Sequence, residues 1–164
     1  MTPITRALHP RRLASRNGPQ LRQLPVPYRV WHERERTQLI RSALEPRLWN
    51  YLAAIARNHG AHVLAVGGTA NHLHILLDLP KDAKLADIVR TLKCNSSRWG
   101  RESHPLFAWQ EGYGAFSVSP SQVNRVKKYI ANQAEHHRSR SFEEEFIGML
   151  IAASIRFDPH QVFG

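Results

Sequence analysis

The sequence predicts an α+β domain in which helices pack on a small antiparallel sheet. Two observations predict this class. Short β-rich runs at 61–66 and 72–77 lie on either side of a glycine-containing turn, which is typical of a hairpin. Longer segments before and after the hairpin repeat apolar residues at helical spacing. The length of 164 residues, without internal repeats, suits one domain.

Four helices are predicted from apolar stripes and end signals. The first has Pro46 near its first turn and Gly60 after its last turn, and the second covers about 82–99. The third opens at a capping box that begins at Ser119, with a proline at the first helical position. A second capping box, beginning at Ser141, opens the last helix.

Further strands are predicted around the second half of the chain. Besides the hairpin, 107–109 and 115–118 read as two short strands. The segment 25–36 holds two prolines and alternating charges, which is a poor pattern for a central strand.

The chain is strongly basic. Its net charge is +10 and its pI is about 10.6, so phosphate polyanions, either nucleic acids or anionic lipid heads, are the expected partners. No apolar run approaches the roughly 20 residues that span a bilayer, and the start lacks the apolar segment of a secretory signal. Cys94 is the single cysteine, so an internal disulfide or a thiolate cage is excluded, and we interpret it as half-buried packing. We expect an intracellular protein.

Residues 1–27 form a basic head that we expect to be irregular. Nine arginines against two glutamates give residues 1–41 a net charge of +7. Five prolines up to residue 27 interrupt any apolar period. A nonspecific phosphate-binding arm, plain disorder and a transit peptide all fit this composition. The folded domain is expected over 28–164.

The run His72-Leu73-His74 is the first candidate for chemistry. On a strand both imidazoles share one face, while Leu73, Ile75 and Leu77 take the packed face. Two imidazoles on an exposed strand face form half of a metal site. With ten histidines in the chain, a chance pair is the alternative.

Tyr129 and Gln133 are the second candidate, because they lie one turn apart on a predicted helix face. Alone, they also fit a half-buried tyrosine and a solvated glutamine. Together with the histidines they fit one reaction: two imidazoles and an amide oxygen hold a divalent ion, and a tyrosine attacks a phosphodiester. Lys127 and Lys128 could lower the phenol pKa or contact DNA phosphates.

These motifs resemble the HUH endonucleases, and in detail the single-tyrosine transposases of the insertion sequence 200/605 type with their relatives associated with repetitive extragenic palindromes (REP). The similarity runs from about Leu39 to the C-terminus. Its segments are Gly67-Gly-Thr-Ala-Asn-His-Leu-His-Ile-Leu-Leu77, Leu85-Ala-Asp-Ile-Val89, Ser96-Ser-Arg-Trp99, Phe107-Ala-Trp-Gln-Glu-Gly-Tyr-Gly-Ala-Phe-Ser-Val118 and Tyr129-Ile-Ala-Asn-Gln-Ala-Glu-His-His137.

The resemblance implies a fold, a reaction and partners. The fold is an RRM-like (ferredoxin-like) core with the histidines on a central strand. His72, His74 and Gln133 would bind Mg²⁺ or Mn²⁺, and Tyr129 would cleave single-stranded DNA with hairpin or palindromic ends through a 5′-phosphotyrosine. A homodimer is implied, without a membrane or a small-molecule substrate, in the cytoplasm at the nucleoid.

Further residues are weaker candidates for nucleic-acid contacts. Arg90, Lys93 and Arg98 share one predicted helix and could follow a DNA backbone, although a solvated face is the alternative. Tyr113 could stack on an unpaired base. His136 and His137 could bind a metal, but adjacent residues diverge by about 100° on a helix, so we interpret them as surface residues.

Two alternatives to the cleaving enzyme stay open on the sequence. One is an RRM-like module, derived from a decayed or domesticated copy, that binds hairpin DNA or RNA without cutting it. The other is a metal-dependent phosphohydrolase in which water replaces the tyrosine as nucleophile.

Overall fold

The computed structural model describes residues 26–31, 40–80, 82–109, 113–139 and 141–158, and for 26–31 it describes the backbone alone. The expected head lies almost wholly outside these ranges, so its boundary at residue 27 stays a prediction. In the described part of the chain, no helix is long and apolar enough to cross a membrane.

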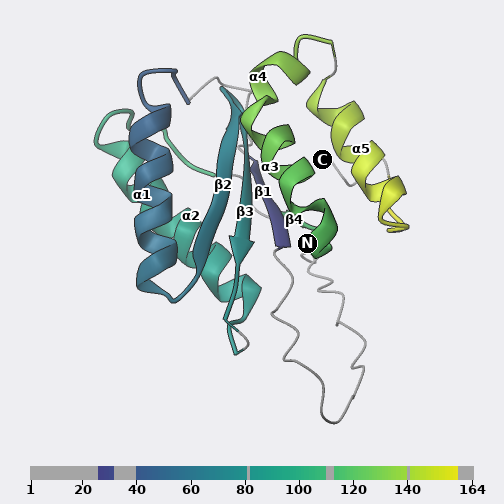
Figure 1. The fold of residues 1–164 in the computed structure, drawn as a ribbon. Coiled ribbons are helices and arrows are strands. Elements are labelled where there is room, and N and C mark those ends of the chain that lie inside the picture. The colour runs from purple at the N-terminus through teal and green to yellow at the C-terminus, as the bar shows by residue number, and fades with distance from the viewer. Residues whose placement is uncertain (1–25, 32–39, 81, 110–112, 140, 159–164) are drawn as a thin grey trace.

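A four-stranded antiparallel sheet forms the centre of the fold (Figure 1). Its strands are β1 (Val26–Trp31), β2 (His62–Thr69), β3 (His72–Asp78) and β4 (Gly114–Ala115), in the spatial order β2-β3-β1-β4. The chain order β1-α1-β2-β3-α2-β4 with this strand order is the ferredoxin-like arrangement. The predicted α+β, RRM-like class is therefore confirmed.

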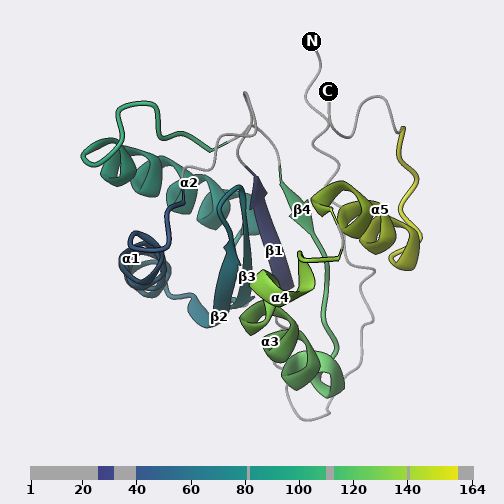
Figure 2. The ribbon, with the colours of Figure 1, turned by 90° about the horizontal axis from the view of Figure 1, so that it is seen from above.

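Helices α1 (Glu45–Asn58) and α2 (Leu85–Arg101) cover one face of the sheet (Figure 2). The apolar stripe of each helix is buried against the odd-numbered side chains of β3, Leu73, Ile75 and Leu77, which are 0% exposed. The rings of Tyr51 and Trp99 stack between the two helices, 5.2 Å apart. This layer is the main hydrophobic core.

The opposite face is covered by the C-terminal helices. These are a 3₁₀ turn, η1 (Pro120–Gln122), then α3 (Val123–Ala131), α4 (Gln133–His136) and α5 (Phe142–Ala152). A small apolar cluster of Leu76, Val118 and Ile130 fixes α3 to the sheet. A Cβ at Gly67 would collide with the carbonyl oxygen of Ile130, so glycine is required for the close approach of α3 to β2.

Ser141 forms the predicted capping box. Its hydroxyl accepts a hydrogen bond from the Glu144 N–H at 3.2 Å, and the Glu144 carboxylate accepts one from the Ser141 N–H at 3.0 Å. The box predicted at Ser119 is not formed, because the chain there makes a 3₁₀ turn and the Ser119 hydroxyl bonds Ser121 at 3.0 Å.

Several strand predictions were wrong. The segment at Val26–Trp31 is central despite Pro27, and its pairing with β4 covers only Tyr28 and Arg29. At Pro27 the strand therefore has a described neighbour on one side only, and a residue without an N–H is tolerated there. Residues 107–109 form no strand, since Phe107 instead fills the core above Gly100. Of 115–118, only Ala115 belongs to a strand.

Candidate functional site

The two histidines of β3 point to the face that α3, α4 and α5 cover. His72 is 1% exposed and His74 is 3% exposed, with ring centroids 5.2 Å apart. The sequence predicted the shared face but also an exposed one, which was wrong. The C-terminal helices close over this side of the sheet and bury both rings.

Hydrogen bonds fix the orientation of His72. Its Nδ1 lies 2.8 Å from the hydroxyl of Thr69, the last residue of β2, and 2.8 Å from Oδ1 of Asn71 in the turn before β3. Its Nε2 faces Gln133 Oε1 at 3.1 Å. Burial, followed by the charge of a protonated His74, lowers the pKa of His72 to about 3. At neutral pH the His72 imidazole is therefore uncharged, the form that binds metals.

Gln133 reaches the histidines because the predicted third helix is broken. At Asn132 the backbone leaves helical geometry, with φ −102° and ψ 21°, and α4 begins at Gln133. The Gln133 side chain is 1% exposed, and its Nε2 donates to the Tyr129 carbonyl oxygen at 3.4 Å. Tyr129 is half-buried on α3, with its ring centroid 5.5 Å from that of His74. The fold thus brings His72, His74, Gln133 and Tyr129 together within one chain.

Two residues that the sequence analysis missed also enter this site. Glu145 of α5 is 6% exposed, and its Oε2 lies 3.0 Å from His137 Nε2 and 3.7 Å from His74 Nε2. The interpretation of His137 as a surface residue was wrong, because its side chain is 12% exposed and contacts this carboxylate. We call His72, His74, His137 and Glu145 the His/Glu cluster; their candidate ligand atoms all lie within 4.8 Å of one another.

A sequence signal existed for His137, which follows Gln133 by four residues, the same one-turn spacing that links Tyr129 to Gln133. Glu145 gave no such signal, because it ends a run of three glutamates in the first turn of its helix, where acidic residues are common. The cluster offers uncharged imidazole nitrogen, amide oxygen and carboxylate oxygen, a donor set that fits a divalent cation.

The predicted basic residues divide between the two sides of the sheet. Lys127 and Lys128 directly precede Tyr129 on α3, and Lys128 is exposed. Arg90, Lys93 and Arg98 lie on α2, in the opposite layer (Figure 2). Arg90 pairs with Asp87 at 3.1 Å on the surface.

Tyr113 also belongs to the layer of α1 and α2. It packs against the main core, and burial raises its pKa. The fold therefore brings Lys127 and Lys128 to the histidine side and keeps Tyr113 and the α2 residues away from it.

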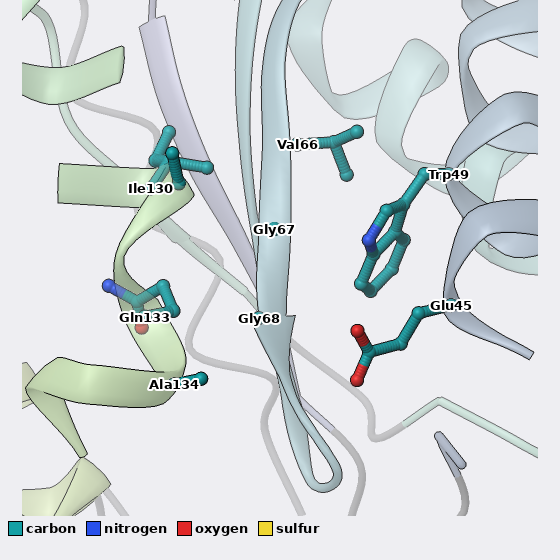
Figure 3. Close-up of a pocket in the computed structure, with 9 residues that line it drawn as sticks. Glu45, Trp49, Val66, Gly67, Gly68, Ile130, Gln133 and Ala134 are labelled. Carbon is teal, nitrogen blue, oxygen red and sulfur yellow. The ribbon is translucent and has the colours of Figure 1, made fainter. Parts of the chain in front are cut away.

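A pocket of about 160 Å³ lies at the outer edge of β2 (Figure 3). Glu45 and Trp49 of α1 form one wall, Gly67 and Gly68 the floor, and α3 and α4 the other wall, which includes Gln133. Burial raises the pKa of Glu45. None of the four His/Glu cluster residues lines this pocket, but Gln133 is shared by the pocket wall and the histidine site.

The family model "Transposase IS200 like" matches residues 27–133, which include both histidines, Tyr129 and Gln133. The chain belongs to the IS200-like transposase family. Membership makes it a transposase that acts on DNA, and it confirms the resemblance found in the sequence. The match ends at Gln133, so His137 and Glu145 lie beyond it.

Relatives agree with this assignment. ISDra2 transposase TnpA of Deinococcus radiodurans is 25% identical over 112 residues, which cover 63% of this chain and 80% of the relative. A crystal structure described as a transposase from D. radiodurans R1 superposes with a TM-score of 0.54 at 22% identity, covering 73% of this chain and 98% of that one. The structure of a REP-associated tyrosine transposase bound to a REP hairpin superposes with a TM-score of 0.56 at 16% identity. The match covers 76% of this chain and 74% of that one. At these identities the two structures show the shared fold.

Proposed function

We propose that this IS200-like transposase nicks and rejoins single-stranded DNA in a cation-dependent reaction, with Tyr129 as the nucleophile. One observation carries the proposal. The Gln133 amide oxygen lies 3.1 Å from His72 Nε2, and the Tyr129 ring lies 5.5 Å from the His74 ring, although these residues come from one strand and two helices. The side chains proposed as cation ligands and as nucleophile therefore lie next to one another.

His72, His74 and Gln133 would hold the cation, Mg²⁺ or Mn²⁺. The uncharged state of His72 and the orientation of its ring by Thr69 and Asn71 support this role. The bound ion would polarise the scissile phosphodiester and offset the charge that develops on its oxygens.

The Tyr129 hydroxyl would form a bond to phosphorus while the bond to the 3′-oxygen breaks. The phenol gives up its proton, the leaving oxygen takes one up, and the products are a 5′-phosphotyrosine and a free 3′-OH. A free phenol has a pKa of about 10, so Lys127 and Lys128 would favour the phenolate as well as contact the backbone. Rejoining reverses the step: the 3′-OH attacks the phosphotyrosine, and no ATP is needed.

Hairpin-ended DNA is the proposed substrate. A relative of the same fold is bound to a REP hairpin, and the net charge of +10 suits a polyanion. Since each chain has one such tyrosine, mobilising two DNA ends calls for two copies, and we propose a homodimer. In the structure the tyrosine and the histidines of a single chain already meet.

A single assay tests the proposal. Labelled single-stranded hairpin DNA is incubated with the protein and Mn²⁺ or Mg²⁺, and products are separated on a denaturing gel. We expect a protein–DNA adduct that Tyr129→Phe loses, while Tyr51→Phe, which alters a tyrosine in the opposite layer, retains it.

Two other outcomes would contradict the proposal. Binding without cutting would identify a nucleic-acid-binding module. Cutting that persists in Tyr129→Phe would identify a hydrolase in which water is the nucleophile.

A further inference from the structure

We propose that His137 and Glu145 are cation ligands, so that five side chains hold the ion: His72, His74, Gln133, His137 and Glu145. The inference rests on the proposed function, because it concerns the same cation. It goes further in that the last two residues lie beyond the part of the chain that the family model matches. The C-terminal segment would then complete the site.

The spacing of the donor atoms supports this set. In an octahedral site with bonds of about 2.1 Å, adjacent donors lie about 3 Å apart. Gln133 Oε1 lies 3.1 Å from both His72 Nε2 and His137 Nε2. Glu145 Oε2 lies 3.0 Å from His137 Nε2 and 3.7 Å from His74 Nε2. The five donors thus form a chain of neighbours, and the four from the His/Glu cluster all lie within 4.8 Å of one another.

Burial of a carboxylate supports the same conclusion. Glu145 is 6% exposed, and its Oε2 lies against the Nε2 atoms of His137 and His74, at 3.0 Å and 3.7 Å. A divalent cation at the centre of the cluster would add a favourable charge interaction to this buried carboxylate. The neighbouring His136 differs, since its Nε2 is 3.9 Å from Glu145 Oε1 and its side chain is 32% exposed.

The position of Glu145 is set by its own helix. The capping box at Ser141 fixes the start of α5, and the Phe142 ring packs on the His72 ring with centroids 5.1 Å apart. These two contacts fix the first turn of α5, which also carries Glu145, next to the histidines. A ligand held by local structure in this way loses little conformational entropy when it binds.

The set has a chemical consequence. Three imidazoles favour a transition-metal ion such as Mn²⁺ over Mg²⁺, which prefers oxygen ligands. Five protein donors leave one of six octahedral positions for an oxygen of the DNA phosphate.

Mn²⁺ binding to the full-length protein, without DNA, tests the inference. Isothermal titration should give one site, and Glu145→Gln and His137→Ala should each bind Mn²⁺ at least about 10-fold more weakly. Glu135→Gln removes an exposed carboxylate and His59→Ala an exposed imidazole, so both controls should bind as the wild type does. Wild-type affinity in both cluster variants would overturn the inference.

A second measurement does not depend on how the variants fold. X-ray absorption of the Mn²⁺-loaded wild type should count three imidazole ligands, whereas two would overturn the inference. Failure of the proposed function is distinguishable, because Tyr129→Phe should retain the ion and its three imidazoles whether or not it loses the DNA adduct.

Discussion

The two faces of β3 are almost equally buried, but one belongs to the hydrophobic core and the other to the candidate site. On one face Leu73, Ile75 and Leu77 are 0% exposed and pack against α1 and α2. On the other, His72 and His74 are 1% and 3% exposed and lie among polar groups of the C-terminal helices. Burial therefore does not distinguish core from site in this strand, and the chemistry of the covering layer does. Neighbouring positions can be changed to separate stability from catalysis.

The largest effect is expected on the polar face. His72→Ala should abolish DNA cleavage, because it removes a proposed ligand, while much of the DNA affinity remains, since phosphate contacts lie elsewhere. Gel cleavage and equilibrium binding to the same hairpin oligonucleotide measure the two properties. Full cleavage by this variant would show that His72 has no part in holding the ion.

The matched change on the apolar face should act on stability. Ile75→Ala leaves a cavity in the main core and should lower the free energy of unfolding by about 2–5 kcal/mol. Folded Ile75→Ala should still bind Mn²⁺ with wild-type affinity. Denaturant unfolding and titration below the transition check both statements, and abolished ion binding in folded protein would mean that the two faces are coupled.

The pH dependence of the free energy of unfolding should also distinguish the two faces, because only the polar face carries titratable histidines. The pKa of His72 falls from 6.5 to about 3 on folding. Between these values the unfolded chain binds more protons, so the free energy of unfolding of the ion-free protein should fall as pH drops from about 6.5 toward 3. His72→Gln should flatten this dependence relative to the wild type, whereas Ile75→Val should shift the curve without changing its slope.

The smallest effect is expected from the basic head, which lies almost wholly outside the described residues. Deleting residues 1–24 removes five arginines and should weaken nonspecific DNA binding. The salt dependence on single strands should become shallower, by about 0.7 in log–log slope for each phosphate that the shortened chain no longer neutralises. An unchanged slope would show that the head does not bind phosphate.

Local patterns were enough for much of the fold. Alternation along 72–77 predicted which side chains of β3 face the core, and the Ser141 box predicted the start of α5. The break at Asn132 and the return of Glu145 to the histidines depend on how the C-terminal helices pack, and no local pattern encodes that. The central place of Val26–Trp31 was missed for a related reason, since strand propensity takes no account of where a neighbouring strand ends.

Gly67 constrains where Tyr129 and Gln133 can lie. Any larger residue there would push the end of α3 outward, and Tyr129 and Gln133 would move with it. Strand β2 contributes no atom to the proposed reaction. The missing side chain at Gly67 nevertheless lets α3 approach the sheet, and so it affects the distance between the Tyr129 ring and the histidine rings. A revertant screen starting from Gly67→Ala would accordingly be expected to return substitutions that shift the end of α3 or reshape the turn at Asn132.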